Sequence, residues 1–151
     1  MKNLIQNILF FTLLSITNAV ALIEIDITEG NREPLPIAIT NFFYDDVDAL
    51  ILSEISNNLS DVVEADLERC GLFDPINEEA FIQKNAAMHL RPRFEDWRLI
   101  KSQALVTGKL KIVDGDKLRV EFRLWDTLAE KELEALVLIT TLDNWRRISH
   151  M

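Results

Sequence analysis

Residues 105–125 read LVTGKLKIVDGDKLRVEFRLW and set the architecture of the second half of the chain. Two strand-forming runs, 105–113 and 118–125, flank Asp114-Gly115-Asp116. An Asp-Gly step between two such runs is a strong hairpin signal, because these residues tolerate the left-handed backbone of a tight turn. Residues 126–130 give a second turn signal, and 133–142 return as another apolar run. The stretch therefore predicts three consecutive strands joined by short turns.

A long amphipathic helix is predicted before this stretch. Apolar residues recur there at spacings of three and four, a pattern typical of a helix that covers a sheet. The apolar positions are Leu52, Ile55, Leu59, Val63, Leu67 and Cys70, and the polar ones are Glu54, Asn58, Asp61, Glu64 and Glu68. We expect Asp45 and Asp46 to cap its start and Gly71 to end it. Cys70, the only cysteine, is expected to be a buried structural thiol rather than a reactive one.

Shorter elements complete an α/β pattern. Strands are predicted at residues 22–28 and 35–43, an extended piece at 72–76, one or two helical turns at 78–83, a short helix around 94–100, and a last helix capped by Asp143 that places Trp145, Ile148 and Met151 on one face. Pro36 is expected near the start of its strand, where a missing N–H matters least. The length of 151 residues suits one small domain with its own hydrophobic core.

The first 21 residues are typical of a secretory signal peptide. They carry one charged side chain, Lys2, and residues 4–16 are largely apolar. Ala19-Val20-Ala21 gives the small-x-small pattern of a cleavage site, so Ala19 and Ala21 are the predicted cleavage residues and Leu22 the first mature one. A membrane anchor is the alternative, but a spanning helix needs about 20 apolar residues and this run is shorter and interrupted. We expect an exported chain with no membrane span after cleavage.

The mature chain is strongly acidic. The whole sequence has a formal net charge of −9, and losing Lys2 makes it −10. Such a chain repels phosphate backbones and anionic lipid surfaces, so nucleic acid is excluded as a partner and basic proteins remain possible.

No motif for catalysis, a metal or a cofactor is found. Gly108-Lys109 lacks the preceding glycine-rich turn of a phosphate-binding loop, and no Gly-x-Ser-x-Gly elbow is present. His89 and His150 stand far apart without partners in the sequence, so we expect them to face solvent or lie in loops rather than bind metal.

Acidic pairs and tryptophans each allow two interpretations. Asp45-Asp46, Glu78-Glu79 and Glu95-Asp96 suit helix caps and solvated surfaces, with general acid–base catalysis as the alternative. Trp97, Trp125 and Trp145 lie on periodic segments and are expected in the core, with a ligand cleft as the alternative. We predict no catalytic residue and no enzyme.

The first mature strand has two possible destinations. Residues 22–28 alternate Ile23, Ile25 and Ile27 with polar residues, and Gly30, Asn31 and Pro34 follow as a flexible break. The strand either pairs within its own sheet or adds itself to the sheet edge of a partner. The residues alone favour pairing within its own sheet, with donation to a partner as the alternative.

Read in order, these pieces resemble the amino-terminal domain of the TolB family, the periplasmic component of the Tol–Pal cell-envelope system. The similarity covers essentially the whole mature chain, and the order and spacing of its motifs make it specific. The matching stretches are residues 23–30 (IEIDITEG), 34–39 (PLPIAI), 66–76 (DLERCGLFDPI), 97–98 (WR), 104–108 (ALVTG), 124–126 (LWD) and 144–147 (NWRR).

The resemblance implies a mixed β-sheet packed with one long and several short helices, in a periplasmic, non-enzymatic adaptor. It implies roles in outer-membrane integrity, cell division and the import of proteins and other macromolecules. It also implies that the mature N-terminus binds the periplasmic domain of TolA. The implied TolA-binding residues are Leu22, Ile23, Glu24, Ile25, Asp26, Ile27, Thr28, Glu29, Gly30, Asn31, Arg32 and Glu33.

The expected organisation is a signal peptide at 1–21, the TolA-binding strand at 22–33 and the α/β domain at 34–151, with its last helix truncated. The family also has a carboxy-terminal β-propeller that binds the lipoprotein Pal. This sequence stops before any propeller repeat, so the resemblance gives no residues for Pal binding. A fragment, a split gene product and a stand-alone domain are all compatible with that length. A periplasmic small-molecule-binding domain and a non-functional truncated remnant are the alternative functions.

Overall fold

Three antiparallel strands form the second half of the sheet, as the sequence predicts. The computed structural model describes residues 33–45, 49–84 and 91–150. Strands β4 (Ala104–Val113), β5 (Lys117–Asp126) and β6 (Lys131–Thr141) follow one another as a meander. Asp114 and Gly115 adopt positive φ in the first turn, which confirms the hairpin signal of the Asp-Gly step.

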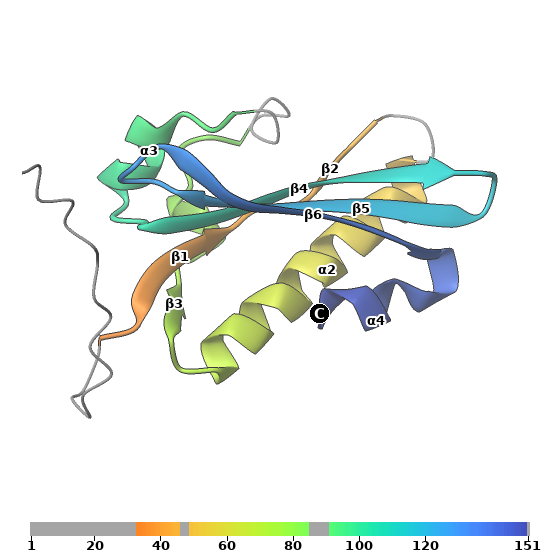
Figure 1. Ribbon diagram of the computed structural model, residues 1–151, viewed down its shortest axis with the longest axis horizontal. Helices are drawn as coiled ribbons and strands as arrows, with labels where there is room; N and C mark the ends of the chain where they lie inside the picture. The colour runs from red at the N-terminus through yellow and green to blue at the C-terminus, as the bar shows by residue number, and fades with distance from the viewer. Residues whose placement is uncertain (1–32, 46–48, 85–90, 151) are drawn as a thin grey trace, which may run out of the picture. The chain divides into compact units, whose positions relative to one another are not determined.

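Three further strands complete the sheet through parallel pairings and make it mixed. Strand β1 (Leu35–Ile39) pairs with β3 (Phe73–Pro75) on one side and with β4 on the other. The strand order is β3-β1-β4-β5-β6, and β2 (Phe43–Tyr44) also pairs with β4 (Figure 1). This arrangement confirms the α/β class with a mixed sheet.

The strand expected at 35–43 is split in two. The N–H and the hydroxyl of Thr40 both donate to the carbonyl of Val106, at 3.1 and 3.2 Å, and the chain then leaves the ladder. Ser56 donates to the carbonyl of Phe42 at 2.9 Å. A helix hydroxyl thus satisfies backbone that the sheet would otherwise pair, so β1 and β2 are separate strands. Pro36 is the second residue of β1, near its start as predicted.

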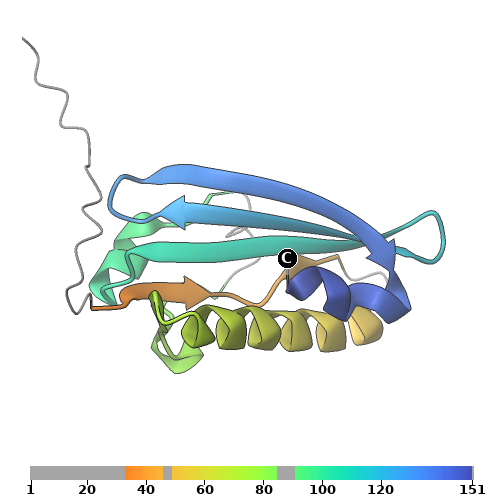
Figure 2. The same ribbon diagram turned by 60° about the horizontal axis from the view of Figure 1, so that its bottom comes forward.

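Helix α2 (Ala49–Arg69) covers one face of the sheet, and its predicted apolar side packs there (Figure 2). Leu52, Ile55 and Leu59 are buried, and Val63 and Leu67 are partly buried. Gly71 has φ +72°, and its N–H bonds to the carbonyl of Glu68 at 3.0 Å, so it ends the helix as predicted.

Two predictions about the ends of α2 are wrong. Asp45 lies four residues before Ala49, too far to cap the helix, and instead pairs with Lys109 at 3.6 Å. Cys70 is exposed rather than buried, and its thiol donates to the carbonyl of Leu67 at 2.9 Å. The apolar side of α2 becomes more exposed toward the end of the helix, where Val63 and Leu67 are only partly buried. Cys70 follows them at the same spacing and is no longer covered by the sheet.

Aromatic side chains form a second core on the opposite face of the sheet. The short helix α3 (Phe94–Leu99) lies on the side away from α2 (Figure 1), and the 3-10 turn η2 (Glu78–Ala80) leads into Phe81 of this cluster. Phe94 packs edge-on against Trp125, and Phe81 against Trp97, with ring centroids 5.8 and 5.1 Å apart. Trp97 and Trp125 are buried in this cluster, which confirms their assignment to the core.

The chain returns under β6 in a short C-terminal element. The 3-10 turn η4 (Leu142–Asn144) leads into α4 (Trp145–Ser149), which lies beside α2 on the same face (Figure 2). Ile148 is buried and Trp145 is partly buried in the same core cluster, so the two share a face as predicted. Asp143 lies inside η4, and Asn144 holds the cap position without a side-chain hydrogen bond, so capping by Asp143 is wrong.

Other predictions fall outside the described residues: the signal peptide with Ala19 and Ala21, the strand at 22–28, Asp46, His89 and Met151. None of the described helices is both long and apolar enough to cross a membrane.

We predict that Gly108→Ala destabilises the fold. An added Cβ would overlap the ring of Phe42 and come within 2.5 Å of the carbonyl oxygen of Glu121. Phe42 is buried in the core and the carbonyl belongs to β5, so neither can move freely. Overpacking of this kind costs about 1–3 kcal/mol, measurable by denaturant unfolding.

Adding Phe42→Leu to Gly108→Ala makes room for the methyl group, so the double variant should lose less than the sum of the two single losses. An unfolding free energy for Gly108→Ala within 0.5 kcal/mol of the parent would contradict the close approach.

Candidate functional site

The predicted partner-binding segment lies almost entirely outside the described residues. Residues 22–32 are not described, and Glu33 is exposed immediately before β1. The chain is tied to the sheet just after it, since the N–H of Leu35 donates to the carbonyl of Leu72 at 2.9 Å. The described structure therefore gives the anchor of the segment: the start of β1, beside the start of β3.

The anchoring strand is held firmly. Ile37, Ala38 and Ile39 are all buried, and β1 has a hydrogen-bonded neighbour on each side. The carbonyls of Pro36 and Ile37 accept from the N–H groups of Gln103 and Ile76, each at 2.9 Å. The residues preceding Glu33 are therefore attached to a strand that is hydrogen-bonded on both sides.

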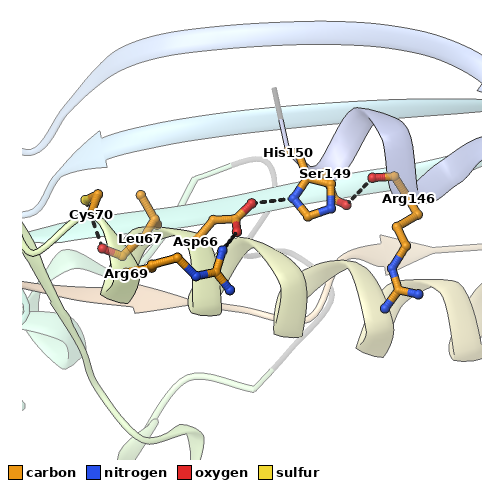
Figure 3. Close-up of polar contacts among 7 residues, drawn as sticks. All are labelled: Asp66, Leu67, Arg69, Cys70, Arg146, Ser149 and His150. Carbon is orange, nitrogen blue, oxygen red and sulfur yellow. Dashed lines mark hydrogen bonds and ion pairs between the residues drawn. The ribbon is translucent and has the colours of Figure 1, made fainter.

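A polar cluster, defined here as Asp66, Arg69 and His150, joins the ends of α2 and α4 (Figure 3). The carboxylate of Asp66 contacts Nδ1 of His150 at 2.6 Å and the guanidinium of Arg69 at 2.6 Å. The pKa of Asp66 is lowered, first because His150 hydrogen-bonds to its carboxylate and also because Arg69 does. His150 is exposed, as expected, and its contact with Asp66 joins residues 84 apart in sequence.

The neighbouring hydroxyl and thiol in Figure 3 bond to backbone. Ser149 donates to the carbonyl of Arg146 at 2.7 Å, and Cys70 to that of Leu67. An activated nucleophile needs a base within hydrogen-bond reach. Ser149 directs its hydroxyl into its own helix rather than toward the imidazole of His150. This geometry suits a structural cluster.

An apolar groove of about 410 Å³ lies next to this cluster. Its floor includes Leu67, Phe73, Phe122, Leu124 and Leu136, so it runs between the end of α2 and the underside of β5 and β6. Asp66, Cys70 and His150 are also among its lining residues. The ligand-cleft alternative predicts a pocket at Trp97 or Trp125, and neither lines this groove.

The tryptophans make structural hydrogen bonds instead. Nε1 of Trp125 donates to the hydroxyl of Thr107 at 2.9 Å, and Nε1 of Trp97 donates to the side chain of Gln83 at 3.3 Å. A buried indole N–H needs such a partner. Both rings therefore fill the core and have their one polar group satisfied.

The acidic pairs lie mostly at helix starts. Glu78 and Glu79 belong to η2, and Glu95 and Asp96 to the first turn of α3, where negative charge is favoured. Asp96 also pairs with Arg93 at 2.6 Å. Within residues 33–45, 49–84 and 91–150, no group of three or more His, Cys, Asp or Glu side chains is arranged to hold a metal ion.

We predict that Asp66→Asn weakens the fold at neutral pH but not in acid. Because the pKa of Asp66 is lower in the folded state than in the unfolded chain, its carboxylate stabilises the fold above the usual carboxyl pKa of about 4. This stabilisation is lost as the pH falls through the folded-state pKa. The Tm of Asp66→Asn should be below that of the parent at pH 7, and the difference should shrink as the pH falls below about 4.

Glu54→Gln, on the exposed side of the same helix, is the matched control, and its Tm should stay close to that of the parent. A constant difference between Asp66→Asn and the parent from pH 7 to pH 3 would contradict the assignment.

Comparison with known proteins agrees with this fold. The family model of the TolB amino-terminal domain matches residues 23–133. The Tol-Pal system protein TolB of Pelagibacter ubique (strain HTCC1062) is 50% identical over 139 residues, covering 88% of this chain and 31% of that relative. The chain thus spans about a third of the length of this curated relative.

Solved structures give the same result. The crystal structure of TolB from Acinetobacter baumannii superimposes with a TM-score of 0.61 at 26% identity, covering 80% of this chain and 26% of that one. The C-terminal domain of LpoB from Escherichia coli, at 10% identity, shares the fold alone, with a TM-score of 0.52 over 76% of this chain and 87% of that one. The family match, the identity to a curated relative and the mixed sheet agree: the chain belongs to the TolB amino-terminal domain family.

Proposed function

We propose that the chain is a periplasmic adaptor of the Tol–Pal system that works by binding rather than catalysis. It binds the periplasmic domain of TolA through residues 22–33, which add a strand to the edge of a TolA sheet. Through this contact it contributes to outer-membrane integrity, to cell division and to the import of macromolecules. Residues 1–21 direct its export and are removed.

Family membership is the observation that carries the proposal. Half of the aligned residues are identical to a protein named as the TolB of the Tol-Pal system, and the family match begins at residue 23. The matched region therefore includes most of the proposed binding segment. Ile23, Ile25 and Ile27 alternate with polar residues in it, which suits a strand with one apolar face.

The sheet topology supports donation of this segment to another chain. Each interior position of the described sheet is filled, because β1, β4 and β5 each have neighbours on both sides. A strand at 22–28 cannot enter between them without displacing a described strand. Its main-chain N–H and C=O groups would then pair at a free edge, and we propose an edge of TolA rather than the edges of this sheet at β3 and β6.

The described side chains fit a binding protein. Trp97 and Trp125 belong to the core, and Ser149 has its hydroxyl bonded within α4. The exposed surface is strongly acidic overall, with a formal net charge of −9 for the whole sequence. Such a surface favours encounter with basic protein partners.

Deleting residues 22–33 should abolish binding to the isolated periplasmic domain of TolA, measured by isothermal titration calorimetry. A flexible segment loses conformational entropy on binding, so we expect a parent Kd on the order of micromolar. The Tm should stay within about 2 °C of the parent, because no described element is removed. Unchanged affinity in the deletion variant would refute the proposal.

A proline within the segment tests the strand pairing itself. Ile25→Pro removes one N–H from the ladder and restricts φ, so we expect binding to TolA at least 10-fold weaker by the same titration. Ile25→Val keeps a β-branched side chain and a normal backbone and should bind like the parent. If the two variants bound equally, side chains rather than strand pairing would make the contact.

A further inference from the structure

Strand β6 is a free edge of the sheet. It lies at the end of the strand order β3-β1-β4-β5-β6, and within the described part of the chain it pairs with β5 alone. At 11 residues it is also the longest strand. One row of its N–H and C=O groups therefore faces outward, which makes it a template for another strand.

The two halves of β6 differ in their protection. The first half carries Lys131, Glu132 and Glu134, and the register shifts by one residue opposite Leu124 and Trp125. Charged residues and bulges of this kind usually prevent an edge strand from pairing with another chain. From residue 135 to 141 the sequence is ALVLITT, with no charge, proline or glycine.

The unprotected half also exposes apolar side chains. Leu136, Val137 and Ile139 have exposed fractions of 43, 48 and 60%. Val137 and Ile139 stand opposite Glu121 and Arg119 of β5, and these two charged residues pair with each other. Exposed apolar side chains of β6 therefore lie beside a charged pair of β5 that is already neutralised. An apolar centre with a polar rim is typical of protein interfaces.

The strand is complementary to itself. An antiparallel copy centred on Val137 brings apolar residues and threonines together and sets no charge against a like charge. The facing pairs are Leu133 with Thr141, Glu134 with Thr140, Ala135 with Ile139, Leu136 with Leu138, and Val137 with Val137. Cross-strand pairs of this kind stabilise sheets, whereas like charges directly opposite destabilise them.

We propose that β6 pairs with β6 of a second copy, forming a weak, symmetric homodimer with one sheet continuous across both chains. This interface is separate from residues 22–33 and does not depend on TolA. Two-fold symmetry is the expected arrangement, because the same surface serves both copies.

The size of the contact sets its strength. A nine-residue strand is about 30 Å long and a sheet about 10 Å thick, so the contact covers on the order of 300 Å² on each copy. A standard stable interface covers about 800 Å² on each partner. Each copy also carries a net charge of −9, so the two repel one another. We therefore expect a transient dimer that strengthens as salt screens the repulsion.

Sedimentation equilibrium of the purified exported chain over a range of concentrations tests the proposal. All proteins carry Cys70→Ser, because the exposed thiol would otherwise form disulfide-linked dimers. We expect a monomer–dimer equilibrium that tightens as the salt concentration rises from about 0.05 to about 0.5 M. A monomer at every concentration and both salt levels would overturn the proposal.

Two substitutions locate the interface. Val137→Lys places two like charges at the two-fold axis and should weaken association at least 10-fold. Leu128→Lys is the matched control, because Leu128 is 63% exposed but lies in the turn between β5 and β6. Both should keep the parent Tm, since both side chains are largely in solvent. Association that Val137→Lys leaves intact would overturn the proposal.

A cysteine at the axis tests the register. Val137→Cys in the Cys70→Ser background should form a disulfide-linked dimer under mild oxidation, while Leu128→Cys should not. Equal cross-linking of the two would overturn the predicted pairing. Association that weakens with added salt would also overturn it, because opposite charges rather than apolar strand pairing would then hold the copies together.

Discussion

The ladder between β1 and β4 joins the two halves of this chain, and the other elements depend on it. Residues 37–39 pair there with residues 104–106, so strands far apart in sequence become neighbours. Ile37 and Ile39 meet Val106 on the face covered by α2, while Ala38 and Leu105 meet on the aromatic face. One short parallel pairing thus supplies side chains to both cores. Forming such a contact requires the closure of a long loop, which costs conformational entropy.

The same ladder explains which parts of the fold can be read from the sequence. The meander of β4, β5 and β6 and the body of α2 are encoded by adjacent residues: a turn signal at Gly115, a three-to-four spacing, and Gly71 at the helix end. The split between β1 and β2 depends on Ser56 in another element, and the Asp66–His150 contact joins elements 84 residues apart. No local pattern carries that information. The resemblance to the family predicted the mixed sheet, which pattern alone did not specify.

The errors at the helix ends have a common physical cause. Asp45 and Asp143 were each expected to cap a helix because carboxylates favour that position. Asp45 pairs with Lys109 across the sheet, and Asp143 lies in a 3-10 turn that begins earlier than the helix. Cys70 continues the apolar spacing of α2 but falls beyond the sheet that would cover it. Periodicity gives the side of a helix on which a residue lies, and tertiary structure decides whether that side is covered. Of the candidate partner-binding residues, the described structure includes only Glu33, so their role stays a prediction.

A fold that offers strands to other proteins has to keep its own sheet intact. Here the proposed donor segment joins the sheet at β1, and the free edge of β6 is separated from β1 by β4 and β5. Long antiparallel ladders join those strands to one another, whereas the segment before Glu33 is tied in by the short parallel pairing of β1. Binding of TolA at residues 22–33 would therefore leave the hydrogen bonds of β6 in place, and pairing at β6 would leave those of β1 in place. Since neither contact needs a reacting side chain, both depend on the same property: main-chain groups at the margins of a sheet whose interior is fully paired.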